Sequence, residues 1–264
     1  LGQVARELCD GIARDGHADL VEQYNYVLPF NIIARIIGVP EEDHPRIQGC
    51  CWDFARMGET NGVDEATARR GDDAARALVA YFGDLAERRR GNPGDDLLSS
   101  LIAAEVDGER LSETEIIGNC IYLFQAGHET TQDLLGNAVV ALFRNPGQLA
   151  LLKRHPELTE QAVEELLRYD GSVQINHRIV LEPVAFGDHV IPEGALIYNF
   201  IGAANRDPAR YADPDRLDLE RRISGHLAFI AGAYYCIGAA LARAEIAAGL
   251  RTLLDRFPDL HPAG

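Results

Sequence analysis

The sequence is poor in several residue types, and each shortage excludes a class of protein. Of its 264 residues, one is methionine and five are cysteines. No Cys-x-x-Cys pair occurs, and the spacing of zinc ligands is absent. Sparse, unevenly spaced cysteines are typical of a reducing compartment in which most thiols are buried and free. A fold held together by disulfides or zinc is therefore not expected.

Positive charge is also short, because 25 Lys and Arg face 41 Asp and Glu, for a formal net charge of −16. This field would repel phosphates, so neither nucleic acid nor an anionic membrane surface is an expected partner. A local basic patch for a protein partner stays open, with Arg243 as a candidate member. No run of about 18 apolar residues occurs, so no membrane span is predicted. Residues 1–19 resemble a charged amphipathic helix rather than a signal peptide, which favours a cytoplasmic protein.

Hydrophobic periodicity predicts a mainly α protein with a small antiparallel β-sheet. A capping box at Ser112 and Glu115 predicts the start of a long core helix. Short β-branched runs around a Gly187-Asp188 turn predict the sheet. The expected helices are 1–19, 20–38, 64–90, 116–143, 148–154, 157–169 and 237–257, and the expected strand runs are 178–180, 184–186 and 189–191.

The long helix carries the unusual segment Ala126-Gly127-His128-Glu129-Thr130-Thr131. The Thr130 hydroxyl can bond back to the carbonyl of Ala126 and open the helix beside Gly127. Such a dent could hold a small ligand and waters, and Glu129 with Thr130 could relay protons into it. The alternative is a tight helix crossing at Gly127, with Glu129 in solvent and His128 facing a neighbouring element.

Glu165 and Arg168 stand three residues apart on the expected helix 157–169. This spacing is typical of an exposed ion pair that contributes a few tenths of a kcal/mol. Leu166 and Leu167 lie alongside, so a partly buried pair is the alternative.

Residues 229–238 form a loop rich in glycine and aromatic residues directly before the last helix. Cys236 at that position would have its thiolate stabilised by the helix N-terminus. Gly232 and Gly238 would let a flat group approach the backbone. A thiolate nucleophile needs a base, and the only histidine nearby is His226, without an elbow motif. A single axial thiolate on iron needs no other protein ligand.

These three motifs, in this order, resemble the haem-thiolate monooxygenases, the cytochrome P-450 family, of the soluble bacterial kind. The resemblance covers essentially all 264 residues, including segments 94–98 and 203–208. It implies a partial cytochrome P-450 fold, with residues 1–264 as one domain that lacks its N-terminal part and its extreme C-terminus. The start at Leu1 and the single Met57 agree with that expectation.

The resemblance also implies a role for each matched residue. Cys236 would be the axial ligand of the iron of haem b (iron protoporphyrin IX), pushing electron density toward dioxygen. Glu129 and Thr130 would be catalytic by delivering protons. The remaining expected residues are Ala126 and Gly127 in the oxygen groove, Glu165 and Arg168 as structural support, Arg178 and His226 near the haem propionates, and Phe229, Gly232 and Gly238 in the haem-binding loop.

The implied reaction inserts one oxygen atom from O2 into a small organic substrate, with electrons from a ferredoxin or a flavoprotein. Three positions depart from the family pattern, since Ile230 replaces the usual Gly, Ala233 a frequent Pro, and Tyr234 the usual His or Arg. These departures are compatible with a haem-binding module that does not oxygenate. A haem-free fragment with a helical interaction role is the third reading.

Overall fold

The computed structural model describes residues 1–14, 16–58, 63–106, 108–223 and 225–263. The chain divides into two compact units. The Cys236 unit comprises residues 1–18 and 133–264, and the Glu129 unit comprises residues 19–132. The expectation of one domain stays a prediction.

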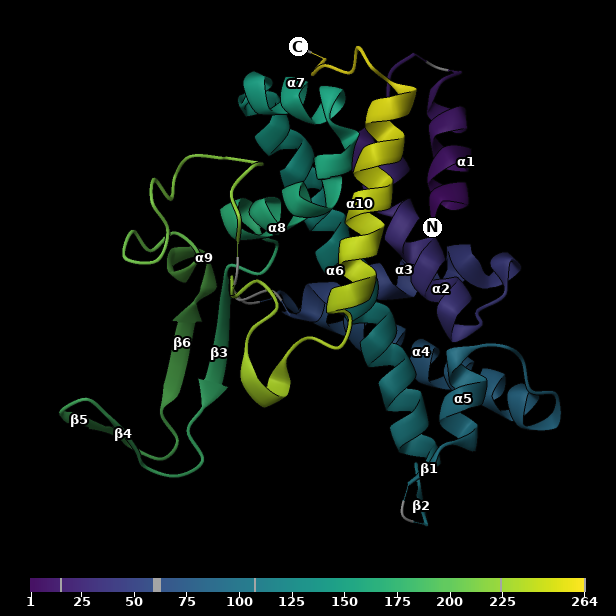
Figure 1. Cartoon of the computed structure of the whole chain (residues 1–264). Helices are drawn as coiled ribbons and strands as arrows, with labels where there is room; N and C mark the ends of the chain where they lie inside the picture. The colour runs from purple at the N-terminus through teal and green to yellow at the C-terminus, as the bar shows by residue number, and fades with distance from the viewer. Residues whose placement is uncertain (15, 59–62, 107, 224, 264) are drawn as a thin grey trace. The chain divides into compact units, whose positions relative to one another are not determined.

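The prediction of a mainly helical protein is confirmed (Figure 1). The segment predicted as one helix over 20–38 begins instead with a π-helical turn, Val21–Asn25, before α2. The leading helix ends earlier than predicted, and position 15 of its predicted range lies outside the described residues. The helices are α1 Gly2–Ile12, α2 Val27–Ile37, α3 His44–Ala55, α4 Glu65–Gly91, α5 Leu97–Ala103, α6 Glu113–Arg144, α7 Pro146–Arg154, α8 Thr159–Asp170, α9 Ile201–Ala204 and α10 Ala239–Arg256.

Six short strands form antiparallel pairs, as expected, but they make separate two-stranded ladders. One ladder of the Cys236 unit pairs β3 with β6, with Ile175 opposite Phe200 and Ile179 opposite Leu196. The hairpin β4–β5 lies between them in the chain and turns at Gly187, whose φ is 57°. The strands are β1 Glu105–Val106, β2 Glu109–Arg110, β3 Ile175–Ile179, β4 Val184–Phe186, β5 His189–Ile191 and β6 Leu196–Phe200.

Side-chain caps determine where the longer helices begin. The Asp64 carboxylate accepts the backbone N–H of Thr67 at 2.7 Å and caps α4. At the start of α6, the Glu115 carboxylate accepts the N–H of Ser112 at 2.7 Å, while the Ser112 hydroxyl accepts the N–H of Glu115 at 3.3 Å. This reciprocal arrangement confirms the predicted capping box, because each partner satisfies a backbone donor that has no partner within the helix.

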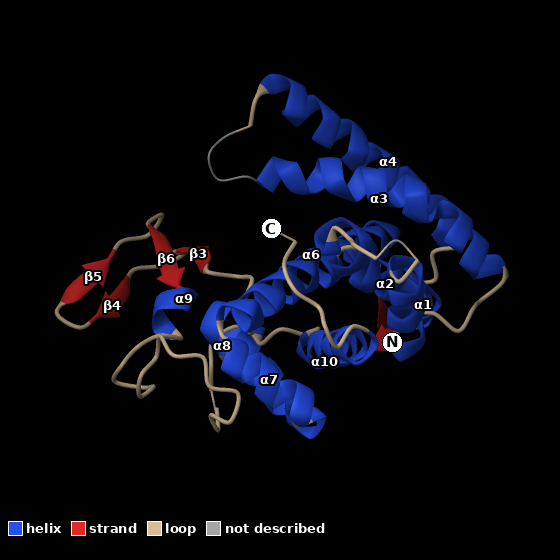
Figure 2. Cartoon of the chain, turned by 90° about the horizontal axis from the view of Figure 1, so that it is seen from above, coloured by secondary structure: helices blue, strands red, loops and turns tan. Residues whose placement is uncertain are grey.

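The core of the Glu129 unit lies among α2, α3, α4 and the first half of α6. Helices α3 and α4 run side by side (Figure 2). Aromatic rings cluster at the centre, with Phe30 and Phe124 in an edge-to-face contact at 5.2 Å. Large buried apolar side chains here include Tyr24, Tyr26, Leu28, Phe30, Ile37, Ile47, Leu78, Tyr81, Phe82, Leu85, Leu98 and Phe124.

In the Cys236 unit, α10 contacts both α1 and α8. One face of α8 is apolar and buried, and α10 turns Ile246, Leu250 and Leu253 inward at the spacing of one helical face. The segment after α9 is turn-rich and leads to the loop that carries Cys236. Helices α8 and α10 therefore form the frame on which that loop is held.

Candidate functional site

Cys236 lies in a loop that ends directly at the first turn of α10. Its backbone N–H donates to the carbonyl of Phe229 at 3.1 Å, and its carbonyl accepts from the N–H of Ala239 at 3.2 Å. Gly238 is the N-cap of α10, and the Cys236 side chain is exposed. The placement predicted from the sequence, a loop cysteine directly before a helix N-terminus, is confirmed.

The surroundings of the thiol are open and apolar. A Cβ added at Gly232, where φ is +79°, would meet no atom within 4 Å, and one added at Gly238 would lie 3.8 Å from the Cys236 sulfur. Ile237 is 88% exposed. A single soft sulfur ligand, with no side chain at Gly238 to fill the space beside it, fits a large planar group such as haem.

Ile230, where the family usually has Gly, has a backbone φ of +61°. A β-branched residue rarely adopts this left-handed conformation, since its side chain crowds the following carbonyl. The sequence departure therefore lies at a position whose backbone suits glycine.

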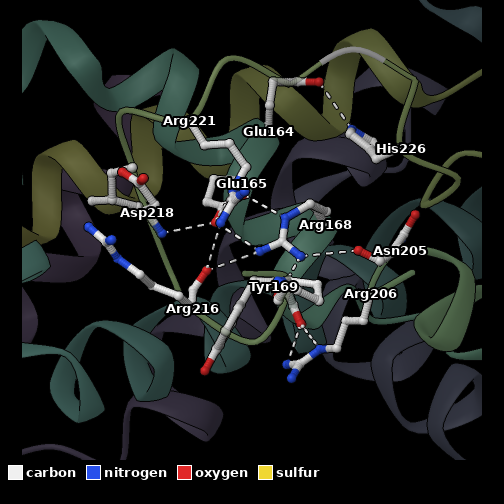
Figure 3. Close-up of polar contacts among 12 residues, drawn as sticks. Glu164, Glu165, Arg168, Tyr169, Asn205, Arg206, Arg216, Asp218, Arg221 and His226 are labelled. Atoms are coloured by element: carbon white, nitrogen blue, oxygen red, sulfur yellow. Dashed lines mark hydrogen bonds and ion pairs between the residues drawn. The ribbon is translucent and has the colours of Figure 1, made fainter. Parts of the chain in front are cut away.

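Glu165 and Arg168 of α8 form a fully buried ion pair (Figure 3). Arg168 Nε donates to Glu165 Oε2 at 2.7 Å, and Nη2 donates to Oε1 at 2.9 Å. Both side chains are 0% exposed. The surface ion-pair reading is wrong, because the apolar neighbours of the pair face the core with it.

The remaining donors of Arg168 are satisfied by backbone carbonyls from distant segments. Nη1 donates to the carbonyls of Asn205 at 3.1 Å and Pro214 at 2.8 Å. Glu165 also accepts the N–H of Asp218 at 2.9 Å and the Nε of Arg221 at 3.3 Å. The pair thus gathers the segment 205–221 onto α8. The resemblance predicted that Glu165 and Arg168 give structural support, but no sequence pattern indicated that they bind the segment 205–221.

A second polar cluster surrounds the neighbouring residue Glu164, and the sequence reasoning missed it. Its Oε2 accepts from His226 Nε2 at 3.1 Å, and its Oε1 accepts from Arg243 Nε at 2.5 Å. Burial raises the pKa of Glu164, but the hydrogen bonds from His226 and Arg243 outweigh it and lower the pKa to about 2. Arg243 is engaged in this cluster, and its membership of a basic docking patch stays a prediction.

The other loop and strand residues predicted to bind haem are placed as follows. His226 and Phe229 lie with ring centroids 5.9 Å apart. The Nδ1 of His226 accepts the N–H of Ala228 at 3.2 Å, so both ring nitrogens have protein partners. Arg178 is exposed on β3 and donates to the carbonyl of His177 at 2.7 Å. Its predicted contact with a propionate, like that of His226, stays a prediction.

In the Glu129 unit, the predicted acid and alcohol are both exposed on α6. The Thr130 hydroxyl donates to the carbonyl of Ala126 at 3.1 Å, as expected. The Glu129 carboxylate accepts from the Nε2 of Gln125 at 3.2 Å. Despite the Thr130 bond, α6 stays α-helical through this segment.

Gly127 lies at a tight crossing with α2, as the alternative reading of the segment 126–131 predicted. A Cβ added there would be 3.0 Å from both Cδ1 and Cγ1 of Ile33. His128 is buried, with its Nδ1 2.9 Å from the carbonyl of Phe124 and its ring 5.5 Å from that of Tyr26. Burial lowers the pKa of His128, so the neutral ring is favoured. His128 is therefore a core residue.

The predicted residues fall into two groups, each described within its own unit. Cys236, its loop and the buried pair of α8 come together in the Cys236 unit, whereas Ala126, Gly127, Glu129 and Thr130 share one stretch of α6 in the Glu129 unit. Among the described residues, no cluster of three or more His, Cys, Asp or Glu could hold a metal ion. In the same part of the chain, every helix is too short or too polar to cross a membrane.

Comparison with known proteins agrees with the order of motifs along the chain. The family model described as "Cytochrome P450" matches residues 68–261, which include both α6 and the Cys236 loop. The chain belongs to the cytochrome P450 family. Comparison with solved structures confirms the predicted fold class, because P450 structures match over nearly the whole chain.

Two bacterial P450 relatives match nearly the whole chain. Cytochrome P450 107B1 of Saccharopolyspora erythraea is 43% identical over 263 residues, covering 99% of this chain and 63% of its own length. Cytochrome P450 monooxygenase PikC of Streptomyces venezuelae is 39% identical, covering 97% of this chain and 61% of its own length. The chain thus spans less than two thirds of the length of these P450 relatives.

Solved P450 structures match with high structural similarity. CYP109E1 of Bacillus megaterium, in complex with testosterone, has a TM-score of 0.91 at 34% identity, covering 98% of this chain and 69% of that one. P450BioI, in complex with an acyl carrier protein ligated to hexadec-9Z-enoic acid, has a TM-score of 0.92 at 33% identity, covering 98% and 66%. The ligands and the protein partner belong to those structures.

Proposed function

We propose that this chain is part of a haem-thiolate monooxygenase that inserts one oxygen atom from O2 into a small organic substrate. The observation that carries the proposal is the exposed thiol of Cys236 directly before the N-terminus of α10, with the side-chain-free Gly238 next to it. Membership of the P450 family supports the same reading. Haem b, when bound through a cysteine thiolate, supplies the activation of dioxygen.

Cys236 would hold the haem iron, with Gly232 and Gly238 giving the backbone clearance that a planar group needs. Phe229 would pack behind the loop, where it is already buried. Arg178 is the better placed of the two candidates for a propionate, because its guanidinium is exposed, whereas His226 is buried with both ring nitrogens bonded.

Glu129 and Thr130 would hold and move protons on the substrate side. Thr130 keeps its hydroxyl oxygen near the helix by donating to Ala126, which leaves that oxygen free to accept a proton donor. Glu129 is held by Gln125 while its carboxylate stays exposed to solvent, as a proton source requires. We further propose a ferredoxin or flavoprotein electron donor and a cytoplasmic location.

The haem ligand is tested by the absorbance spectrum of the reduced protein under carbon monoxide. The expected result is the red-shifted Soret band of a thiolate ligand, lost in Cys236→Ala and kept in Cys50→Ala, which changes a half-buried cysteine of the other unit. Absence of the band, or its survival in Cys236→Ala, would defeat the assignment. Colour without turnover of any substrate would favour a haem-binding module that does not oxygenate, and absence of colour a haem-free role.

The proton-delivery role is tested by coupling. Thr130→Ala should lower the product formed per electron consumed and release peroxide instead, because one member of the proton relay is lost. Thr114→Ala, an exposed threonine in the first turn of the same helix, is the matched control. Equal coupling in both variants would remove Thr130 from the mechanism.

A further inference from the structure

The loop that carries Cys236 begins near His226 and ends where α10 starts. Residues on both sides of this loop contact the same carboxylate on α8: His226 at its start, and Arg243 in the second turn of α10 after its end. At the start, His226 Nε2 lies 3.1 Å from Glu164 Oε2. At the end, Arg243 donates to both oxygens of Glu164, from Nε at 2.5 Å and from Nη2 at 3.1 Å.

Arg243 also contacts Tyr235, the residue that precedes Cys236. Its Nη1 donates to the hydroxyl of Tyr235 at 3.0 Å. Its guanidinium also lies over the ring of Phe229, 4.5 Å from the centroid. Phe229 in turn supplies the carbonyl that accepts the N–H of Cys236. Every contact of this set lies within the Cys236 unit.

The tautomer of His226 follows from its second contact. Because Nδ1 accepts the N–H of Ala228, the ring proton is on Nε2 and points at Glu164. His226 is buried, and Glu164 and Arg243 have side chains 29% and 32% exposed. Bonds to a charged carboxylate that is largely shielded from water are stronger than those at an open surface.

We infer that Glu164 is a positioning residue for Cys236. The Glu164 carboxylate holds the start of the loop to α8 through His226, and it holds the end of the loop through Arg243, which contacts Tyr235. The inference rests on the proposed function only in making Cys236 the haem ligand. It gives His226 a role in holding the loop rather than in binding a propionate. It also separates Glu164 from its neighbour Glu165, which anchors the segment 205–221 (Figure 3).

Glu164→Gln tests this directly, because it keeps the size of the side chain and removes its charge. In the 264-residue chain, amide hydrogen exchange at Cys236 should become about tenfold faster, since the bond to Phe229 opens more often. Glu160→Gln, an exposed acid in the first turn of the same helix, should leave this rate unchanged. Equal exchange rates at Cys236 in the two variants would overturn the inference.

Tyr235→Phe is the milder variant if Glu164→Gln fails to fold. It removes only the hydroxyl that Arg243 reaches, on a side chain that is 50% exposed. Exchange should accelerate about threefold at Cys236 and stay unchanged at Ala228, at the other end of the loop. Acceleration at neither position, or equally at both, would contradict the assignment of separate ties.

Spectra of the haem-loaded protein separate this inference from the proposed function. Glu164→Gln should reduce the fraction of protein with the red-shifted thiolate band, and Arg243→Lys should retain more of that fraction than Arg243→Gln, because Lys keeps the charge. An unchanged band with unchanged exchange overturns the inference and leaves the proposed function standing. Faster exchange in a chain that binds no haem supports the positioning role and overturns the proposed function.

Discussion

Arg168 and Glu165 are held together by two parallel hydrogen bonds, at 2.7 and 2.9 Å, with no part of either side chain exposed to solvent. A charge buried so completely is tolerated only where every donor has a partner. Arg168 meets this condition through three backbone carbonyls in addition to Glu165, those of Asn205, Pro214 and Arg216. The ion pair therefore organises the turn-rich segment more than it adds net Coulomb energy.

Removing one partner should be costly because the other charge is left buried without compensation. Glu165→Gln is expected to lower the free energy of unfolding by about 3–5 kcal/mol. Urea denaturation followed by circular dichroism measures this change. Glu160→Gln, at the exposed start of α8, should cost about 0.5 kcal/mol by weakening the interaction with the helix dipole. Similar losses in the two variants would contradict the buried pair.

Local sequence signals predicted the features that depend on neighbours in the chain. The capping box of Ser112 and Glu115 indicated where α6 begins, because caps act over three positions. The position of Cys236 before α10 likewise follows from glycines and a helical pattern a few residues apart. The bond from Thr130 to Ala126 spans one helical turn, so the residue types predicted it.

Features that depend on distant segments could not be predicted in this way. An i, i+3 spacing of Glu165 and Arg168 is the same on a surface and in a core, and only the packing of segment 205–221 decides between them. Glu164 and Arg243 are 79 residues apart, and no local pattern pairs them. The sequence likewise could not decide whether Gly127 lies at a tight crossing, because its contact with Ile33 depends on how α2 packs against α6.

Because Gly127 lies at a tight helix crossing, Gly127→Ala should not give the stabilisation that alanine usually gives over glycine in a helix. Replacing a helical glycine with alanine should stabilise by about 1 kcal/mol where space allows. Gly118→Ala, exposed on the same helix with no atom within 4 Å of the new Cβ, should show that gain. Gly127→Ala should lack it, because the new Cβ would press on Ile33 at 3.0 Å.

Shortening the opposing side chain should restore the gain. In a double-mutant cycle, Ile33→Ala, which removes both side-chain carbons that lie 3.0 Å from the new Cβ, should make Gly127→Ala more favourable by about 1 kcal/mol than it is in the wild-type background. Urea denaturation of the four proteins gives the coupling. Additive effects of the two substitutions would contradict the tight crossing.

Ile230 predicts a second reversal, this time in the loop of Cys236. Glycine is ordinarily less favourable than alanine by about 0.5–1 kcal/mol, but at a φ of +61° alanine retains the steric clash that glycine lacks. Ile230→Gly should therefore be more stable than Ile230→Ala by about 1 kcal/mol. Ala231, with a φ of −145°, is the control, where Ala231→Gly should destabilise. A more stable Ile230→Ala would show that the left-handed conformation is not kept.

The low pKa of Glu164, about 2 in the folded chain against an ordinary 4.5, predicts how stability depends on pH. Because folding lowers this pKa, the stabilisation from Glu164 is fully present above about pH 4.5 and is lost as the pH falls toward 2. The difference in free energy of unfolding between the wild-type chain and Glu164→Gln, at most about 3 kcal/mol from the size of the shift, should shrink across this window. Arg243→Gln removes the donor to both carboxylate oxygens, so its Glu164 pKa should rise and the loss should begin at higher pH. Urea denaturation at pH values between 2 and 6 measures all three proteins, and a difference that stays constant with pH would show that Glu164 does not titrate in this range.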